Sequence, residues 1–342
     1  MINSLIRFPF SFINLLAGLV QFNSSGKNSD RAYQGMINLF CLTKGHSSDI
    51  VSSWVSSARK PYDLPDANGI LGNLSTSDLE KINADLTDKG YHVFENKLPE
   101  CLCDALLNFA LNSECRITVK PDGSRAREQP LVKYNREKPE GLLYVFDVES
   151  VINNPEVQGL FADKSLISIA QKYLNCQPVL DFPSFWWSTA ASPEASLEAA
   201  QLYHFDMDRL KWLKFFIYLT DVGEKNGPHA FVSGSQKSGG IPSKLLSKGY
   251  ARLTDEMIEA SYSRKDIIHF VAPRGTIIAE DTRGLHKGAH VAEGDRLILQ
   301  IQFSNCLFGT NVPPKRFHSL QDPSLVEMVK QYPRMYSLFH ET

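Results

Sequence analysis

Two histidines and one aspartate stand at spacings that suit a metal ion. His204 and Asp206 are separated by one residue, and in an extended segment residues i and i+2 point to the same side. A second histidine, His286, stands in a short turn between Gly284 and Gly288. Two histidines and one carboxylate form the facial triad of Fe(II) oxygenases, which leaves the other coordination positions open. The pattern therefore favours a non-haem iron site at His204, Asp206 and His286.

Two neighbouring residues are alternatives for this triad. His290 would lie one helical turn from His286, as in some zinc sites, but glycines disfavour a helix in this segment. Asp208 is the alternative to Asp206, although a solvated side chain or a partner of the ligands is its more ordinary role. Lys214 lies on a predicted strand near these residues. We expect its ammonium group to be solvated, and contact with a bound cosubstrate is the alternative.

Arg296 is the candidate for binding an organic anion beside the metal. A 2-oxo acid can occupy two positions on such an iron and dioxygen the third, so the far carboxylate of 2-oxoglutarate needs a cation. Arginine suits this role better than lysine, because its planar guanidinium binds a carboxylate through two hydrogen bonds. Arg296 opens an apolar strand downstream of His286. The ordinary alternative is a surface arginine that forms an ion pair at a strand start.

Longer stretches around these residues match one known family. They read DLEKINADLTDKGYHVFENKLPECLCDALLNFA (78–110), YHFDMD (203–208), FFIYLTDVGEKNGPHAFVSGSQK (215–237) and DTRGLHKGAHVAEGDRLILQIQF (281–303). With these pieces the sequence resembles the phytanoyl-CoA dioxygenase family of Fe(II)/2-oxoglutarate oxygenases, over roughly residues 78–305. The first 75 residues lie outside the resemblance.

The resemblance implies a set of roles and cofactors. His204, Asp206 and His286 would bind Fe(II), Arg296 would hold the 5-carboxylate of 2-oxoglutarate, and Tyr218 would lie against that cosubstrate. The reaction would consume O2, with ascorbate as a reductant, and would hydroxylate an unactivated C–H bond of a small molecule or lipid. Because the metal carboxylate is present, hydroxylation is favoured over halogenation. The competing hypothesis is a jelly-roll binding module without turnover that recognises a sugar, lipid or peptide.

The sequence departs from the family pattern on the substrate side of the site. His229 stands where an apolar residue is usual, and Ser233–Gln236 replaces the common Pro-Gly-Ser-His turn. Trp186 and Trp187 alternate on one predicted strand, so we expect one of them to face inward. Core packing is the ordinary role for that residue, and the wall of a substrate pocket is the alternative.

The order of the predicted elements indicates the fold class. Helical patterns dominate before residue 175, and short β-rich runs separated by Gly, Pro and Asn follow residue 200. The polar region from Arg116 to Gly141 is predicted to be a loop or short hairpin, in the position of a lid. This order predicts an α+β, mainly β protein, with a double-stranded β-helix (a cupin-like jelly roll) core and helices packed on one face.

The chain divides into three predicted regions. Residues 1–74 form an N-terminal helical extension and linker, 75–315 the jelly-roll domain, and 316–342 a helical tail. The apolar segment 1–22 is predicted to be a helix that packs on the domain or on a partner, and a helix on a membrane surface is the alternative. The net charge of −2, with no basic run, disfavours nucleic acid as a partner. Six cysteines without regular spacing favour free thiols in a reducing, cytoplasmic setting.

Overall fold

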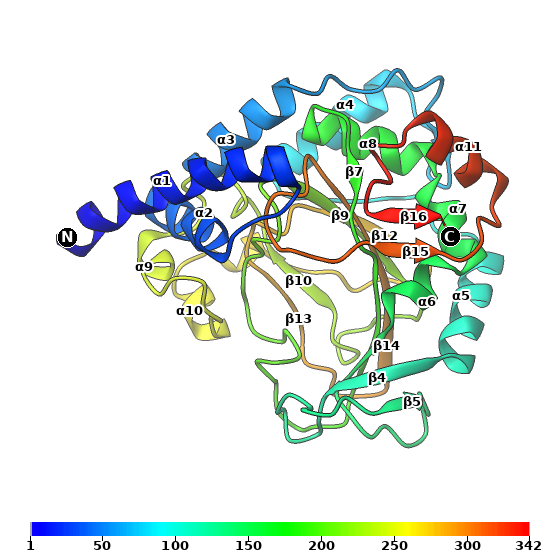
Figure 1. Cartoon of the computed structure of the whole chain (residues 1–342). Helices are drawn as coiled ribbons and strands as arrows, with labels where there is room; N and C mark the ends of the chain where they lie inside the picture. Colours follow the sequence, from blue (N-terminus) through cyan, green and yellow to red (C-terminus); the bar gives the residue numbers. More distant parts are fainter. Residues whose placement is uncertain (1, 342) are drawn as a thin grey trace.

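The protein folds around one large antiparallel sheet, with helices on its outer face (Figure 1). The structure, a computed structural model, describes residues 2–341, and the side chains of residues 8–340. Nine strands form the large sheet: β3 (Tyr91–Val93), β4 (Glu114–Val119), β5 (Leu131–Lys133), β6 (Leu143–Phe146), β7 (Val179–Leu180), β8 (Ser184–Thr189), β9 (Trp212–Tyr218), β12 (Ile277–Glu280) and β14 (Asp295–Ser304). Their order is β3-β12-β9-β14-β8-β6-β4-β5, and β7 also pairs with β14.

A second, smaller sheet contains β10 (His229–Val232), β11 (Ile267–His269) and β13 (His286–Gly288), in the order β11-β10-β13. The predicted short β-rich runs after residue 200 correspond to β9, β10, β11, β12 and β14. The α+β class with a large antiparallel sheet is thus confirmed. The finer expectation of a double-stranded β-helix stays a prediction, because the strand pairings do not show a closed barrel.

The helices cover one face of the large sheet and the N-terminal side of the molecule. They are α1 (Ile2–Ser25), α2 (Asp30–Thr43), α3 (His46–Ser57), α4 (Thr76–Asp88), α5 (Glu100–Asn112), α6 (Val148–Ile152), α7 (Pro155–Phe161), α8 (Lys164–Leu174), α9 (Ser243–Leu246), α10 (Asp255–Glu259) and α11 (Pro323–Gln331). The sequence Ser75-Thr76-Ser77-Asp78 is typical of a helix start, and in the structure Ser75 and Asp78 form a capping box at the start of α4, which satisfies two backbone N–H groups.

Alternation along the central strands separates the core from the site. On β9, Leu213, Phe215 and Ile217 enter the main core under the helices. Lys214 and Phe216 point to the opposite face, because successive side chains of a strand alternate. The strands β6, β8 and β14 are divided in the same way. One face of the sheet therefore builds the core, and the other face is free to line a cavity.

The N-terminal helix packs on the domain, as predicted. The side chain of Leu15 is buried, and at Gly18 an added Cβ would lie 2.1 Å from the Cβ of Ala32, so α1 and α2 are in close contact. These helices share a core cluster with Phe205 and Leu285, which flank the predicted metal ligands. Within residues 2–341, no helix combines the length and apolar character that a membrane span needs.

The polar segment 116–141 takes the hairpin form, one of its two expected forms: β4 pairs with β5, and β4 also pairs with β6 in the large sheet. The C-terminal tail differs from the helical expectation. It holds α11, but its flanks are extended: β15 (Lys315–Phe317) and β16 (Phe339–Glu341) form a parallel pair. This difference arises from pairing between segments that are separated in the chain, which short sequence windows do not encode.

Candidate metal centre and its cavity

The backbone brings two distant segments side by side to build the centre. The N–H of His204 donates to the carbonyl of His286 (2.9 Å), and the N–H of His286 donates back to the carbonyl of His204 (2.8 Å). This isolated antiparallel bridge puts the two imidazoles on the same side. The N–H of Asp206 donates to the carbonyl of Thr282 (2.8 Å), so a further backbone hydrogen bond joins the same two segments. His286 belongs to β13, a strand that the sequence reading missed.

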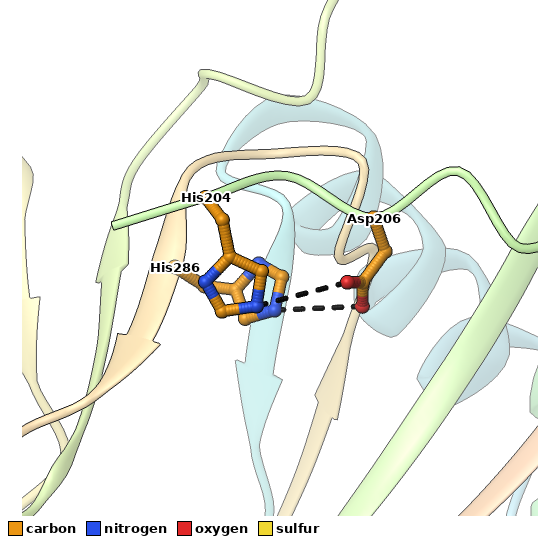
Figure 2. A group of neighbouring side chains, drawn as sticks. All are labelled: His204, Asp206 and His286. Carbon is orange, nitrogen blue, oxygen red and sulfur yellow. Dashed lines mark ion pairs between the residues drawn. The ribbon is translucent and has the colours of Figure 1, made fainter. Parts of the chain in front are cut away.

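The three predicted ligands converge on one point (Figure 2). One potential ligand atom from each of His204, Asp206 and His286 lies within 4.8 Å of the others. The Nε2 atom of His204 is 3.7 Å from Oδ1 of Asp206, and Nε2 of His286 is 3.5 Å from Oδ2. Within residues 8–340, this is the group of His, Cys, Asp and Glu side chains that could hold a metal ion. His290 and Asp208, the two alternatives, are not part of it.

Both imidazoles are fixed in the tautomer that a metal needs. Nδ1 of His204 lies 3.0 Å from the carbonyl oxygen of Leu202, and Nδ1 of His286 lies 3.0 Å from that of Gly284. A carbonyl oxygen can only accept, so each Nδ1 carries a hydrogen, and in the neutral ring Nε2 has the lone pair. Such outer contacts orient the histidine ligands of metal sites. The two Nε2 atoms therefore lie on the Asp206 side of the rings, where each can bind a metal ion through its lone pair.

The charges around the three side chains favour the forms that bind metal. Burial lowers the pKa of His204 well below its usual value, and the nearby His286 lowers it further, so His204 is neutral. Burial alone would raise the pKa of Asp206, but Lys214 and then His286 hold it well below its usual value. Burial would lower the pKa of His286, yet Asp206 raises it. In the metal-free protein Asp206 thus favours a proton on His286, and a divalent cation between these two side chains would replace that proton.

Lys214 is a buried partner of the centre, and the expectation of a solvated side chain is wrong. Its Nζ donates to Oδ2 of Asp206 at 2.6 Å and to Oδ2 of Asp208 at 3.4 Å, and its side chain is buried. These two carboxylates raise the pKa of Lys214 although burial opposes them. Lys214 lies in the middle of the apolar strand β9. A lone charge inside an apolar run was the signal that could have predicted its burial.

A cavity of about 280 Å³ opens beside the three side chains. Its walls include the face of the large sheet that points away from the main core. The lining residues are Leu143, Val145, Ser184, Trp186, Ala199, Ala200, His204, Asp206, Lys214, Phe216, His229, His286, Gly288, Arg296 and Gln300. Trp187 is in the core and Trp186 lines the cavity, so the alternation expected for this pair is confirmed.

Arg296 lines the same cavity as a buried cation without a carboxylate partner among the described residues. Its Nη1 donates to the carbonyl of Gly227, and its Nη2 donates to Oγ of Ser188 at 3.2 Å. Its Nε is buried and has no partner. Burial lowers the pKa of Arg296 from its usual value. Gly288 leaves room for it, because an added Cβ there would lie 2.8 Å from Nη2.

Tyr218 and His229 lie next to each other on the cavity side of the sheet. The hydroxyl of Tyr218 donates to the carbonyl of Phe270 at 3.1 Å and accepts from the N–H of His229 at 3.0 Å. Tyr218 is fully buried and does not line the cavity, so its contact with a cosubstrate stays a prediction. His229 does line the cavity, and its ring centroid is 5.6 Å from that of His286.

A buried carboxyl group, Glu280, supports His229 from behind. Its Oε1 lies 3.0 Å from Nε2 of His229, and burial raises the pKa of Glu280 to about 8. Burial and then the neighbouring His286 lower the pKa of His229 well below its usual value. A neutral Glu280 and a neutral His229 thus form a hydrogen-bonded pair beside the metal centre. The sequence marked His229 as unusual, but it gave no sign of the partner on β12.

Comparisons with known proteins give matches among solved structures. No family model matches the sequence, and no curated protein matches it. The structure of EctD from S. alaskensis with bound Fe is 17% identical and covers 75% of this chain and 88% of its own, with a TM-score of 0.47. The non-heme alpha ketoglutarate dependent epimerase SnoN from nogalamycin biosynthesis is 14% identical, with 67% and 84% covered and a TM-score of 0.46.

A further match is HygX from Streptomyces hygroscopicus, with nickel, 2-oxoglutarate and hygromycin B bound. It is 13% identical, and 71% of this chain and 91% of HygX are covered, with a TM-score of 0.44. These solved structures resemble this chain at TM-scores between 0.44 and 0.47. At such identities the likeness concerns the fold, and the chemistry of this chain follows from its own side chains.

Proposed function

We propose that this chain is an Fe(II)- and 2-oxoglutarate-dependent dioxygenase that hydroxylates an unactivated C–H bond of a small molecule or lipid. The main support is the geometry of His204, Asp206 and His286, whose ligand atoms converge beside an open cavity. Both histidines present Nε2 because their Nδ1 atoms are engaged by carbonyls. A facial arrangement of two histidines and one carboxylate suits non-haem Fe(II).

The surroundings of Asp206 also fit a metal ligand. Lys214 binds Oδ2 of this carboxylate at 2.6 Å, which fixes its orientation and keeps it ionised. A carboxylate that is held in this way can offer its other oxygen to a cation. In the proposed site, Lys214 is a positioning residue, and His204, Asp206 and His286 are the ligands.

Arg296 supports 2-oxoglutarate as the cosubstrate. A buried guanidinium with an unsatisfied N–H and no carboxylate partner is unfavourable by itself. A dicarboxylate that reaches it from the cavity would supply the missing acceptor, and the fork of Arg296 would bind it through two hydrogen bonds. We propose this role for Arg296. We also propose that Tyr218, which is close enough to Arg296 to interact with it electrostatically, lies against the same cosubstrate.

The chemistry of the reaction is divided between the cofactors and the chain. When bound, iron and 2-oxoglutarate supply the oxidant that is generated from O2, with succinate and CO2 as the products of the cosubstrate. The chain orients these groups, holds the substrate, and excludes water through the apolar walls of the cavity. Ascorbate is the proposed reductant that keeps the iron in its Fe(II) form. We further propose that the two sheets belong to a double-stranded β-helix.

The cavity also supports a proposal about the type of substrate. Leu143, Val145, Trp186 and Phe216 give it an apolar wall, and Ser184 and Gln300 add polar groups on the same sheet face. Apolar walls with a few polar groups are typical of sites for small organic molecules. We propose a substrate that presents an aliphatic C–H bond to the centre and hydrogen-bonding groups to the sheet.

The test is the formation of succinate from 2-oxoglutarate by the purified protein, with Fe(II), ascorbate and O2. We expect slow turnover without added substrate, which the variant His204→Ala abolishes. The control variant His46→Ala removes an exposed histidine of the N-terminal region and should retain wild-type turnover. Binding of Fe(II) and 2-oxoglutarate is measured in parallel by calorimetry without O2. If neither one binds, the proposal is wrong, and a jelly-roll binding module without turnover becomes the better interpretation.

A further inference from the structure

One helix combines a packed inner face with an apolar outer face. Within residues 8–340, fourteen large apolar side chains are exposed, and nine of them lie between Phe8 and Trp54. Six belong to α1, and we call them the α1 outer face: Phe8, Phe10, Phe12, Ile13, Leu16 and Val20. Val20, Phe10 and Ile13 are 72%, 66% and 60% exposed. Contiguous exposed apolar surfaces of this kind usually contact a partner or a membrane.

The exposure is not that of a loose segment, because the other side of α1 is tightly packed. Ser11 and Leu15 are buried, and an added Cβ at Gly35 of α2 would lie 2.8 Å from the carbonyl oxygen of Ser11. The ring of Phe22 packs edge-on against Phe308, 5.7 Å away. Figure 1 shows α1 (dark blue) on the outside of the molecule. The fold therefore fixes α1 with its outer face directed away from the domain.

The charge of this region points to the kind of surface that the outer face contacts. Residues 1–60 contain six Lys and Arg and two Asp, a net charge of +4, whereas the whole chain has −2 and the remainder therefore −6. No acidic residue precedes Asp30. The other acidic residue, Asp49, already pairs with Arg283 at 2.9 Å. Basic and apolar residues together on one helical region are typical of helices that bind anionic membrane surfaces.

We propose that the α1 outer face binds the surface of an anionic lipid membrane, with α1 lying in the plane of the interface. Apolar side chains enter the lipid, while Lys27, Arg31 and Lys44, which are exposed, attract the acidic headgroups. A second copy of the chain is a poorer occupant, because a symmetric contact would bring two regions of net charge +4 together. This inference does not depend on the proposed catalytic function.

The test is flotation of the full chain with lipid vesicles. Vesicles of phosphatidylcholine mixed with phosphatidylserine are compared with vesicles of phosphatidylcholine alone, at low and high ionic strength. The variant Phe10→Asp/Ile13→Asp changes the centre of the outer face and leaves the packed face intact. The matched control Leu131→Asp/Val271→Asp makes the same changes at two exposed apolar positions of the acidic remainder. Circular dichroism and thermal unfolding verify that each variant is folded.

We expect the wild-type chain and the control variant to float with the anionic vesicles, and less so at high salt. The Phe10→Asp/Ile13→Asp variant should lose at least about tenfold in partitioning, because two large apolar groups are replaced by charges that the lipid repels. Equal partitioning of the two variants would overturn the proposal. An absence of binding to the anionic vesicles would also overturn it. If sedimentation then shows a self-association that Phe10→Asp/Ile13→Asp abolishes, a second copy of the chain is the occupant.

Discussion

Two buried arginines of this protein should respond in opposite ways to the same substitution. Arg209 pairs with Asp181 through two hydrogen bonds, of 2.6 Å and 3.0 Å. Arg296 is equally buried but has only neutral partners, Gly227 and Ser188. If Arg296 binds a carboxylate of 2-oxoglutarate, replacing Arg296 by methionine should impair binding of this anion and leave the stability of the metal-free protein nearly unchanged.

The magnitudes follow from the contacts of each guanidinium. Burial costs a charged group several kcal/mol, and the two hydrogen bonds of Arg296 return about 1.5–3 kcal/mol each. These terms nearly cancel, so Arg296→Met should change the free energy of unfolding by less than about 1.5 kcal/mol. Arg209→Met leaves a buried carboxylate without its cation and should cost about 3–5 kcal/mol.

The effect on cosubstrate binding should be the reverse. Loss of one partner of a desolvated, hydrogen-bonded charge pair costs about 2–5 kcal/mol. Arg296→Met should therefore raise the Kd of 2-oxoglutarate by a factor between about 30 and several thousand. Arg296→Lys, which keeps the charge but not the planar fork, should give an intermediate Kd.

Two measurements on the same samples test this reasoning. Urea unfolding of the metal-free variants gives the stabilities, and calorimetric titration of 2-oxoglutarate into Mn(II)-loaded protein without O2 gives the Kd values. The reasoning is refuted if Arg296→Met destabilises the protein as much as Arg209→Met and leaves the Kd of 2-oxoglutarate unchanged. Arg296 would then be a structural residue of the sheet.

Three further predictions concern the buried charges. Lys214→Met should destabilise the metal-free protein by about 3–5 kcal/mol, because Asp206 loses its cation; Mn(II) should restore part of this loss in urea unfolding, and an equal loss with and without Mn(II) would contradict the metal site. Glu280→Gln should leave the free energy of unfolding unchanged at about pH 5 and increase it at about pH 9. Burial raises the pKa of the folded Glu280 to about 8, so the wild-type protein loses stability as the pH rises toward 8. Unfolding free energies of variant and wild type that differ equally at both pH values would disprove this. Asp181→Asn should cost about 3–5 kcal/mol at neutral pH. Burial opposes the shift, but Arg209 lowers the pKa of the folded Asp181 carboxyl. The stability that this pair contributes should therefore be present above the unfolded pKa and disappear as acid protonates the folded carboxyl. A difference in unfolding free energy between variant and wild type that stays constant down to low pH would argue against it.

The local order of the sequence determined much of the fold and the centre of the site. Short β-rich runs between Gly, Pro and Asn predicted the strands β9 and β14, because these residue types favour strands and turns over short stretches of the chain. The spacing of His204 and Asp206 placed two side chains on one face, because residues i and i+2 of an extended segment point to the same side. Ser75 and Asp78 marked the start of α4, because a helix cap involves only residues of its own first turn.

What only the tertiary structure decided depends on contacts between residues far apart in the chain. The bridge between His204 and His286 joins segments more than eighty residues apart, and no local pattern encodes that pairing. The same holds for the burial of Lys214 against Asp206 and for the missing partner of Arg296. A charged residue in a sequence is solvated by default, since burial costs several kcal/mol. Only the packed structure shows which charges are buried, which are paired, and which one remains available to a ligand.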